Sequence, residues 1–281
     1  ASEHLGNCDV CPLVCGVDRL SGELGICRTG EFARVSSYGP HHGEERPISG
    51  RNGSGTIFFA RCNLRCVYCQ NADISQLGYG KEMTPSELAS IMLDLQAVGC
   101  HNINLVSPSH IVPQIIQAVH LAALKGLKIP LVYNTGGYDS LEMLSLLDGV
   151  VDIYMPDMKY SDAKTAWQYS RVKNYPSINQ AAVLEMYRQV GALKMDTQGI
   201  ACRGLLVRHL VLPNHLAGSE RVLDFLAGNV SKEVSVNLMA QYHPAYQANH
   251  YPELDRYARP SEYREVVDYA RQIGLHRLDH A

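Results

Sequence analysis

Apolar positions in this 281-residue chain fall into short runs that alternate with longer stretches of helical periodicity from about residue 56 onward. The short runs are rich in Val, Ile and Leu, which is typical of strands buried on both faces. Strands are expected over residues 56–60, 102–106, 129–133, 150–155, 205–212 and 234–239. Alternation of strands with helices implies parallel strands joined by right-handed crossovers. The pattern fits an open doubly wound sheet and a barrel equally well.

Helical segments between the strands carry start and stop signals. Thr84, Pro85 and Glu87 make a capping box at the start of the first helix, and Gly126 ends the second. Helices are expected over residues 84–98, 112–125, 141–147, 162–192 with an interruption at Pro176, 220–226 and 261–273. The first 50 residues are instead broken up by Gly, Pro and Cys. We therefore expect a small Cys-rich metal-binding segment over residues 1–50 and one α/β domain over residues 51–281.

Composition and charge narrow the class of protein. Hydrophobic residues make up 46% and charged residues 19% of the chain, an ordinary globular balance. The net charge of −3 argues against a nucleic-acid or membrane-surface partner, both of which favour a basic excess. No apolar run approaches the roughly 20 residues of a membrane helix, and the first residues do not resemble a signal peptide. We expect a cytoplasmic protein without nucleic-acid or membrane partners.

Cysteine is unusually frequent for such a protein. Seven of the nine cysteines lie in the first 69 residues, in two groups. Clustered cysteines in a reducing compartment hold metal more often than they form disulfides. Composition therefore indicates an intracellular metalloprotein, typical of a low-oxygen setting. Cys100 and Cys202 lie outside both groups, and we expect them to be packed thiols.

Cys62, Cys66 and Cys69 form a C-x3-C-x2-C loop directly after the first predicted strand. Iron–sulfur clusters normally use four thiolates. Three thiols on one tight loop can hold three irons of a [4Fe–4S] cluster and leave the fourth open to a substrate or cofactor, which suggests catalysis. A zinc loop without its fourth ligand, or a buried cysteine cluster, is the alternative. The spacing, the aromatic Tyr68 and the preceding strand together favour the iron–sulfur interpretation.

A second set of four thiols lies nearer the N-terminus. Cys8, Cys11, Cys15 and Cys27 are separated by two, three and eleven residues. Four thiolates on short loops match a closed tetrahedral site for zinc or a single iron. They would also serve a fully ligated second [4Fe–4S] cluster that relays electrons. We favour the mononuclear site.

Polar residues follow or interrupt the predicted strands after the first one. Surface turns are often polar, so one such cluster alone indicates only a turn. Several clusters at the same end of a parallel sheet predict a polar mouth above the cysteine loop. These residues are Ser107, Ser109, Asn134, Thr135, Asp157, Lys159, Arg208 and His243.

The cysteine loop, with Tyr68 in the aromatic position of C-x3-C-x-aromatic-C, resembles the signature of the radical S-adenosylmethionine (SAM) superfamily. The order of features from residue 56 to residue 239 is similar to that of the glycyl-radical activating enzymes, such as the pyruvate formate-lyase activases. The Cys-rich N-terminus resembles that of an uncharacterised branch of activase homologues. The resemblance implies a partial (β/α)6 TIM-like barrel with its chemistry at the carboxyl ends of the strands.

The same resemblance implies a [4Fe–4S] cluster on the three-cysteine loop and SAM as cofactor. Reductive cleavage of SAM would give a 5′-deoxyadenosyl radical, which removes hydrogen from a protein glycine or from a small molecule. The protein would act as an oxidoreductase and take its electron from flavodoxin or ferredoxin. Residues 242–257 are expected to form either a partner-binding loop or a lid.

The resemblance also assigns SAM contacts, with two departures from the activase pattern. Asp157 and Lys159 match the Asp-x-Lys motif, and Arg208 and His243 match residues beside the cofactor; a strand-edge salt bridge and a core histidine are the alternatives. Ser107 and Ser109 replace a Gly-Gly-Glu stretch, and Asn134 and Thr135 replace an acidic residue, which weakens a monovalent cation site. The full set of expected contacts is Tyr68, Ser107, Ser109, Asn134, Thr135, Asp157, Lys159, Arg208 and His243.

A second class of function stays open at this point. An iron–sulfur electron-transfer or redox-sensing protein would not cleave SAM, and the missing Gly-Gly-Glu favours it. The three-thiol loop and the barrel pattern argue against it. Formation of 5′-deoxyadenosine distinguishes the two.

Overall fold

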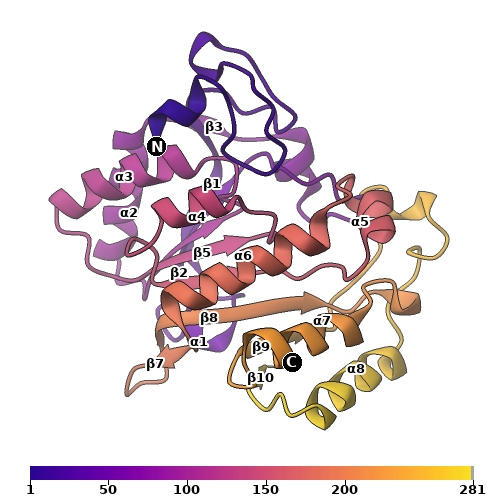
Figure 1. Ribbon diagram of the computed structural model, residues 1–281. Helices are drawn as coiled ribbons and strands as arrows, with labels where there is room; N and C mark the ends of the chain where they lie inside the picture. Colours follow the sequence, from indigo (N-terminus) through magenta and orange to yellow (C-terminus); the bar gives the residue numbers. More distant parts are fainter. Residues whose placement is uncertain (280–281) are drawn as a thin grey trace.

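A mostly parallel sheet forms the centre of the computed structural model, which describes residues 1–279 (Figure 1). Neighbouring strands in its central part are parallel and follow one another in chain order. These strands are β2 (Ser54–Phe59), β4 (Ile103–Val106), β5 (Leu131–Thr135), β6 (Ile153–Pro156), β8 (Ala201–Leu210) and β9 (Ser235–Met239). Strands in chain order with helical crossovers confirm the expected partial TIM-like barrel.

Strands that the sequence pattern did not predict complete the sheet. On one edge, β1 (Ala33–His41) pairs antiparallel with β2, and β3 (Lys81–Met83) pairs antiparallel with β1. On the other edge, β10 (Leu278–Asp279) lies parallel to β9. Away from the edges, β7 (Lys194–Met195) pairs antiparallel with the start of β8. Only the first part of β1 is buried, so its apolar alternation is short and its pattern weak.

The helices occupy most of the predicted segments. They are α1 (Arg46–Ser49), α2 (Pro85–Ala97), α3 (Val112–Leu124), α4 (Leu141–Leu146), α5 (Ala163–Ser170), α6 (Tyr175–Val190), α7 (Ser219–Phe225) and α8 (Pro260–Gln272). The capping box of Thr84 and Glu87 is present. The expected helix over 162–192 is two helices, because Arg171 adopts a left-handed conformation after α5 and Pro176 lies in the first turn of α6.

Single helical turns fill several connections. They comprise 3-10 turns over Ser2–Leu5, Arg19–Ser21, Pro213–His215 and Ala248–His250, and π turns over Asp73–Leu77 and Leu226–Val230. The helices α6, α7 and α8 lie together over one part of the sheet, and α2 and α3 over another (Figure 1). None of the helices in residues 1–279 is long and apolar enough to cross a membrane.

The short helix α1 closes the barrel at the amino ends of its strands. A Cβ added at Gly50, directly after α1, would meet His101 and Ile200, the residues just before β4 and β8. Ile48 is fully buried among Val132, Ile153 and Leu206, in a cluster of side chains from β5, β6 and β8. Apolar packing thus forms the floor of the barrel, and the polar residues described below lie above it.

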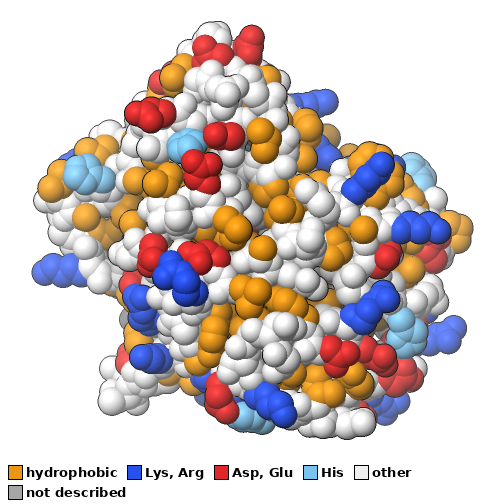
Figure 2. Space-filling view, in the orientation of Figure 1, with side chains coloured by type: hydrophobic (Ala, Val, Ile, Leu, Met, Phe, Trp, Pro, Cys, Tyr) orange, Lys and Arg blue, Asp and Glu red, His pale blue; other side chains and the backbone are white. Residues whose placement is uncertain are grey.

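The Cys-rich N-terminal loops lie at one end of the molecule, at the top of Figure 1. The buried guanidinium of Arg19 donates to the carbonyls of Gly30 and His110, at 2.9 Å each, and so fastens these loops to the end of β4. Acidic and hydrophobic side chains cover the exposed part of the loops (Figure 2). The boundary at residue 50 stays a prediction, and β1 pairs with β2 across it.

Candidate active site

The three-cysteine loop leaves the carboxyl end of β2 and is held in place by α5. Arg61 turns the chain with a φ of 73°. The amides of Arg65 and Val67 then donate to the carbonyls of Ser170 and Tyr169, at 3.1 and 2.9 Å. The loop is therefore fixed by backbone contacts before any metal is considered.

Each sulfur of the loop has a hydrogen-bonding group beside it. The amide of Leu64 lies 3.4 Å from Cys62 Sγ. The hydroxyls of Ser170 and Ser75 lie 3.0 and 3.1 Å from the sulfurs of Cys66 and Cys69. A thiolate accepts hydrogen bonds, so these groups suit sulfurs that have lost their protons to a metal.

Burial favours the protonated form of the free thiols of Cys62 and Cys66. It raises the pKa of Cys62 to about 12, with a further rise from neighbouring Cys66. Burial also raises the pKa of Cys66, although the cation of Lys159 opposes the shift. Metal binding must therefore displace these protons. Three thiols with bonding groups on their sulfurs fit a [4Fe–4S] cluster with one open iron, and Cys62, Cys66 and Cys69 would hold it.

Tyr68 packs under the loop rather than at its surface. Its side chain is buried, and its hydroxyl lies 2.6 Å from the hydroxyl of Tyr160. Tyr160 in turn lies 2.8 Å from the Ser170 hydroxyl, which contacts Cys66. Burial raises the pKa of Tyr68 well above its usual range, so the phenol stays neutral. The aromatic position thus helps to order the donors around the sulfurs.

Four predicted residues from β5, β6 and β8 meet beside the loop. Asp157 accepts from Lys159 Nζ at 2.6 Å and from Arg208 Nε at 3.0 Å. Arg208 Nη2 also donates to Asn134 Oδ1 at 2.6 Å. The structure thus brings together Asn134, Asp157, Lys159 and Arg208, as the strand-end argument expected.

The ionic network fixes the charge of each member. Burial alone would raise the pKa of Asp157, but Arg208 and Lys159 offset it and hold this pKa below its usual range. Burial alone would lower the pKa of Lys159, but Asp157 raises it instead. One carboxylate thus stands between two cations, and the group carries a net positive charge next to the loop. A positive charge suits the carboxylate of an amino acid such as SAM.

Two residues of α6 support the backbone of this network. The Tyr175 hydroxyl and the Asn179 amide donate to the Asp157 carbonyl at 3.0 and 2.9 Å. Gly137 passes close by with a φ of 75°, and a Cβ there would lie 2.1 Å from the same carbonyl. Only glycine fits this approach.

A small cavity of about 220 Å³ connects the loop to the network. Cys66, Tyr68, Asp157, Lys159 and Arg208 line it. It borders a larger cavity of about 750 Å³, and both share the lining residues Asn71, Arg208, Met239 and Gln241. Cys66, Cys69 and the ionic network therefore face one connected space at the carboxyl ends of the strands.

The other residues expected to contact SAM lie outside the ionic network. The hydroxyls of Ser109 and Thr135 are buried 2.8 Å apart, and Thr135 donates to Asp139 at 2.7 Å. Ser107 is half-buried with a φ of 61°. His243 is exposed, with Nδ1 3.2 Å from the Gln70 amide at the rim. The core alternative for His243 is therefore wrong.

The four N-terminal cysteines lie on neighbouring loops. Cys8, Cys11 and Cys27 are buried and Cys15 is half-buried. Burial, with smaller effects of the other three thiols, raises the pKa of Cys11 to about 12. A Cβ at Gly25 would lie 2.9 Å from Cys15 Sγ, so only a glycine at this position lets the loop pass so close to Cys15. The arrangement supports a shared site.

The spacing of these sulfurs bears on the kind of metal. Within residues 1–279, one group of side chains has ligand atoms that all lie within 4.8 Å of one another: His4, Asp9 and Glu142. Neither cysteine set forms such a group. A zinc–sulfur distance of about 2.3 Å places the thiolates of one tetrahedral ion about 3.8 Å apart. Thiolates on different irons of a cluster are farther apart, so a single ion and a cluster need different spacings of the four sulfurs.

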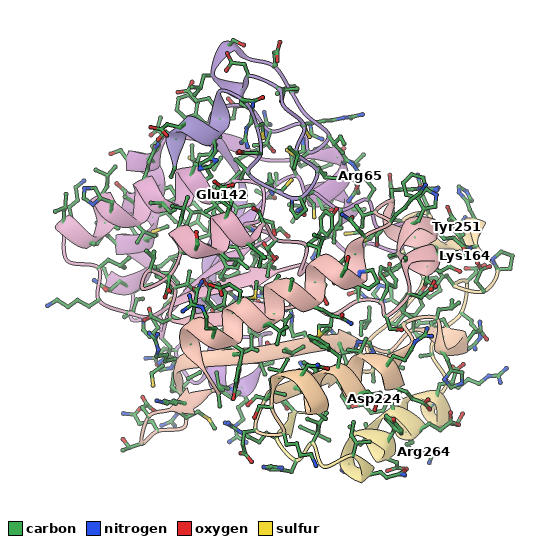
Figure 3. All side chains as sticks on the ribbon, in the orientation of Figure 1. Arg65, Glu142, Lys164, Asp224, Tyr251 and Arg264 are labelled. Atoms are coloured by element: carbon green, nitrogen blue, oxygen red, sulfur yellow. The ribbon has the colours of Figure 1, made fainter. Side chains whose placement is uncertain are left out.

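The N-terminal loops touch the three-cysteine loop directly. The Arg65 guanidinium donates to the Ile26 carbonyl, next to Cys27. Figure 3 shows Arg65 where the N-terminal loops meet the rest of the chain. Leu13 packs against the core cluster that contains Leu64 and Cys66. The two cysteine sets therefore belong to adjoining parts of one structure.

The two remaining cysteines differ from each other. Cys100 is buried, as expected. Cys202 is exposed, so the prediction of a packed thiol is wrong there. It lies on β8 where β7 pairs with it, and its side chain is on the solvent side of that hairpin.

Several residues of the site were missed by sequence reasoning. Tyr160 and Ser170 lie about a hundred positions from the cysteines they support, and no local pattern marks them. Asp139 follows Thr135 by four residues and could have been noticed as a polar group after a strand. The remaining missed residues are Glu44 and Glu45, which line the larger cavity.

Solved structures with known chemistry share the fold at low sequence identity. SuiB of Streptococcus suis, solved with its precursor peptide SuiA, aligns with a TM-score of 0.53 at 12% identity, over 79% of this chain and 46% of SuiB. HydG of Carboxydothermus hydrogenoformans gives 0.53 at 12% identity, over 78% and 50%. Methylornithine synthase (PylB) gives 0.51 at 13% identity, over 80% and 70%. The chain thus spans about half the length of SuiB and HydG.

Sequence comparison identifies the family. An uncharacterized protein of Methanocaldococcus jannaschii, MJ0674, is 33% identical over 277 residues, which cover 96% of this chain and 75% of that protein. The sequence pattern of the Radical SAM superfamily matches residues 56–226, which include the cysteine loop and the ionic network. This chain therefore belongs to the radical SAM superfamily, whose enzymes use a [4Fe–4S] cluster and S-adenosylmethionine.

Proposed function

We propose that Cys62, Cys66 and Cys69 hold the [4Fe–4S] cluster and that SAM binds in the adjoining cavity. The observation that carries this proposal is the set of three sulfurs, each beside a hydrogen-bonding group, of which Cys66 and Cys69 share a cavity with the Asp157–Lys159–Arg208 network. When bound, the cluster would supply the electron that breaks a carbon–sulfur bond of SAM, so that hydrogen could be removed from substrate.

The protein residues bind and orient the cofactor. Lys159 would receive the SAM carboxylate, because it carries a buried charge directly beside Cys66. Arg208 and Asn134 would fix Asp157, and Asp157 would hold Lys159 in place. Ser107 replaces part of the Gly-Gly-Glu stretch that binds the methionyl amine of SAM in the activases, and it would receive that amine here. The two cations already neutralise Asp157, so the site needs no monovalent cation.

The activase-like subtype is the second part of the proposal. Activation of a partner protein would need an accessible mouth, and His243 and Gln70 at the rim are exposed. Residues 242–257, however, pack against the cluster loop, with the Gln247 amide donating to the Val67 carbonyl at 2.8 Å. We infer an oxidoreductase whose substrate enters through the larger cavity, with flavodoxin or ferredoxin as reductant.

The N-terminal cysteines are proposed as a second metal site. Cys8, Cys11, Cys15 and Cys27 would hold one zinc or iron ion, as the sequence suggests, or a second [4Fe–4S] cluster. Iron, zinc and acid-labile sulfide analysis of purified protein separates these cases. A cluster adds four irons and four sulfides, and a zinc ion adds neither.

The test of the proposed function is anaerobic. Wild-type protein, Cys66→Ala and Cys202→Ala are reconstituted with iron and sulfide, and 5′-deoxyadenosine is measured after addition of SAM and dithionite. Cys202→Ala is the matched control, since this thiol is exposed on the β7–β8 hairpin. We expect product from the wild type and the control, none from Cys66→Ala, and unchanged metal at the N-terminal cysteines in all three.

Two outcomes contradict the proposal. Equal product from Cys66→Ala would remove the cysteine loop from the reaction. No product from cluster-loaded wild type would favour the electron-transfer or redox-sensing alternative.

A further inference from the structure

The larger cavity, of about 750 Å³, lies inside the barrel beside the proposed SAM site. Its size is that of a small-molecule site. The segment between β1 and α1 supplies Glu44 and Glu45 to its lining, and β5, β8 and β9 supply Asn134, Arg208 and Asn237. Neither glutamate belongs to the cysteine loop, and Glu44 reaches the ionic network around Asp157 through its 3.8 Å pair with Arg208.

Glu45 places an unpaired carboxylate oxygen in this cavity. The residue is only 8% exposed, and Oε1 accepts from Asn237 Nδ2 at 2.7 Å. Oε2 is buried and has no hydrogen-bond partner within residues 1–279. A buried carboxylate oxygen that accepts no hydrogen bond costs free energy. The position therefore favours a donor supplied by a bound molecule.

Glu44 adds a second carboxylate to the same wall. Its Oε1 accepts from Asn104 Nδ2 at 3.0 Å, and its Oε2 lies 3.8 Å from Arg208 Nη1. Burial raises the pKa of Glu44; Arg208 opposes this rise, and the nearby Glu45 adds a smaller one. Arg208 is already bonded to Asp157 and Asn134, so it neutralises Glu44 only in part.

The charges around the two cavities leave an excess of one carboxylate. Glu44, Glu45 and Asp157 oppose Lys159 and Arg208. At the rim, the exposed side chains of Arg46 and Asp279 carry opposite charges, and His41 is half-buried. The part of the larger cavity that Glu44 and Glu45 line is therefore negative, and Oε2 of Glu45 is a free hydrogen-bond acceptor there.

We propose that the larger cavity binds an organic cation, with a primary amine or guanidinium held by Glu44 and Glu45 and the rest of the molecule extending toward the cluster. This inference rests on the proposed function, because it names the substrate class of that site. The enclosed position of Glu45 favours a free small molecule. A lysine or arginine side chain of a peptide offers the same chemistry, and the experiment separates the two sources.

The experiment is anaerobic calorimetry on cluster-loaded protein with SAM present. Agmatine and cadaverine are the cationic probes, pentane-1,5-diol is the uncharged match, and glutarate is the anionic one. A capped Gly-Lys-Gly peptide represents the side-chain source. Glu45→Gln and Glu44→Gln keep the shape of each side chain, and Glu82→Gln on the exposed strand β3 is the control.

We expect at least one cationic probe to bind and the diol and glutarate not to bind. Loss of one charge-assisted hydrogen bond should weaken cation binding roughly tenfold or more in Glu45→Gln and Glu44→Gln. Glu82→Gln should match the wild type, and SAM affinity should stay unchanged in all variants. Tighter binding of the peptide than of agmatine would support the inference with a side chain as the source.

Three results overturn the inference. The cations bind no better than the diol, or Glu45→Gln and Glu44→Gln bind them like the wild type, or these variants lose SAM affinity instead. In the last case the glutamates serve the cofactor. Formation of 5′-deoxyadenosine by the wild type is measured in parallel. The inference alone fails if product forms without cation binding, whereas absence of product with cation binding counts against the proposed function.

Discussion

Replacing Asp157 by Asn removes the negative charge between two buried cations while keeping the shape of the side chain. Asp157 accepts from Lys159 at 2.6 Å and from Arg208 at 3.0 Å. The asparagine amide can accept one of these bonds but cannot neutralise either cation. The variant therefore tests how much the ionic network contributes to folding, apart from any effect on SAM.

The expected loss follows from the burial of the pairs. Removing one partner of a buried ion pair costs roughly 3–5 kcal/mol. The three side chains are 14–19% exposed, and Glu44 still lies 3.8 Å from Arg208. We therefore expect the lower end, about 3 kcal/mol, which corresponds to a fall of about 5–10 °C in the melting temperature of a chain of this size.

Urea unfolding of the metal-free protein under reducing conditions measures this loss. Glu82→Gln is the control, because its pair with Arg34 is exposed and 3.5 Å long; such pairs contribute about 1 kcal/mol or less. A difference below about 1 kcal/mol for Asp157→Asn, like that of a surface pair, would refute the buried-network argument.

The pH dependence has a definite sign. The folded pKa of Asp157 is lowered, because Arg208 and Lys159 outweigh the effect of burial. Its stabilisation is therefore complete above the unfolded pKa of about 4 and is lost as the pH falls through the folded value. The stability gap between wild type and Asp157→Asn should be constant from about pH 6 to 8 and should narrow in acid. A gap that widens in acid would contradict the assignment.

Two further variants test the supports of the site. Gly137→Ala should cost several kcal/mol in urea unfolding, because its Cβ would lie 2.1 Å from the Asp157 carbonyl; Gly149→Ala, with a φ of 77° but open space around it, should cost only about 1 kcal/mol. Equal losses would mean that backbone conformation, not the close approach, sets the cost. Ser170→Ala removes the hydroxyl 3.0 Å from Cys66 Sγ and should lower the cluster reduction potential by tens of millivolts or so, as measured by potentiometric titration with electron paramagnetic resonance. An unchanged or higher potential would show that this hydroxyl does not stabilise the reduced cluster.

The regular part of the fold could be predicted from the sequence. Parallel strands buried on both faces give continuous apolar runs, and caps such as Thr84 mark helix starts. The edge strands could not be predicted in this way. β1 is half exposed and contains Gly39 and Pro40, so its pairing depends on β2 and β3 rather than on its own pattern.

The site was predictable to the extent that strand ends meet. Asn134, Asp157, Lys159 and Arg208 come together because parallel strands bring their carboxyl ends to one edge. Ser109 and Thr135 follow the same rule but bond to each other and to Asp139, a choice that only side-chain packing decides. Glu44 and Glu45 precede a one-turn helix whose burial depends on Ile48 and the barrel floor, and no periodicity reveals this.

The bond from Arg19 to His110 has a consequence for the order of assembly during synthesis. The two residues are 91 positions apart in the chain. Chains emerge from the ribosome N-terminus first, so the cysteine-rich loops are made long before the carbonyl that anchors them. Until the chain has been made as far as His110, the Arg19 guanidinium lacks this carbonyl as a partner. The seven thiols of the first 69 residues stay accessible during that time. Metal delivered in that interval meets N-terminal cysteine loops that are not yet fixed, whereas metal delivered afterwards meets loops that are docked on the barrel. The bond to His110 therefore places the docking of the N-terminal loops after synthesis of the end of β4.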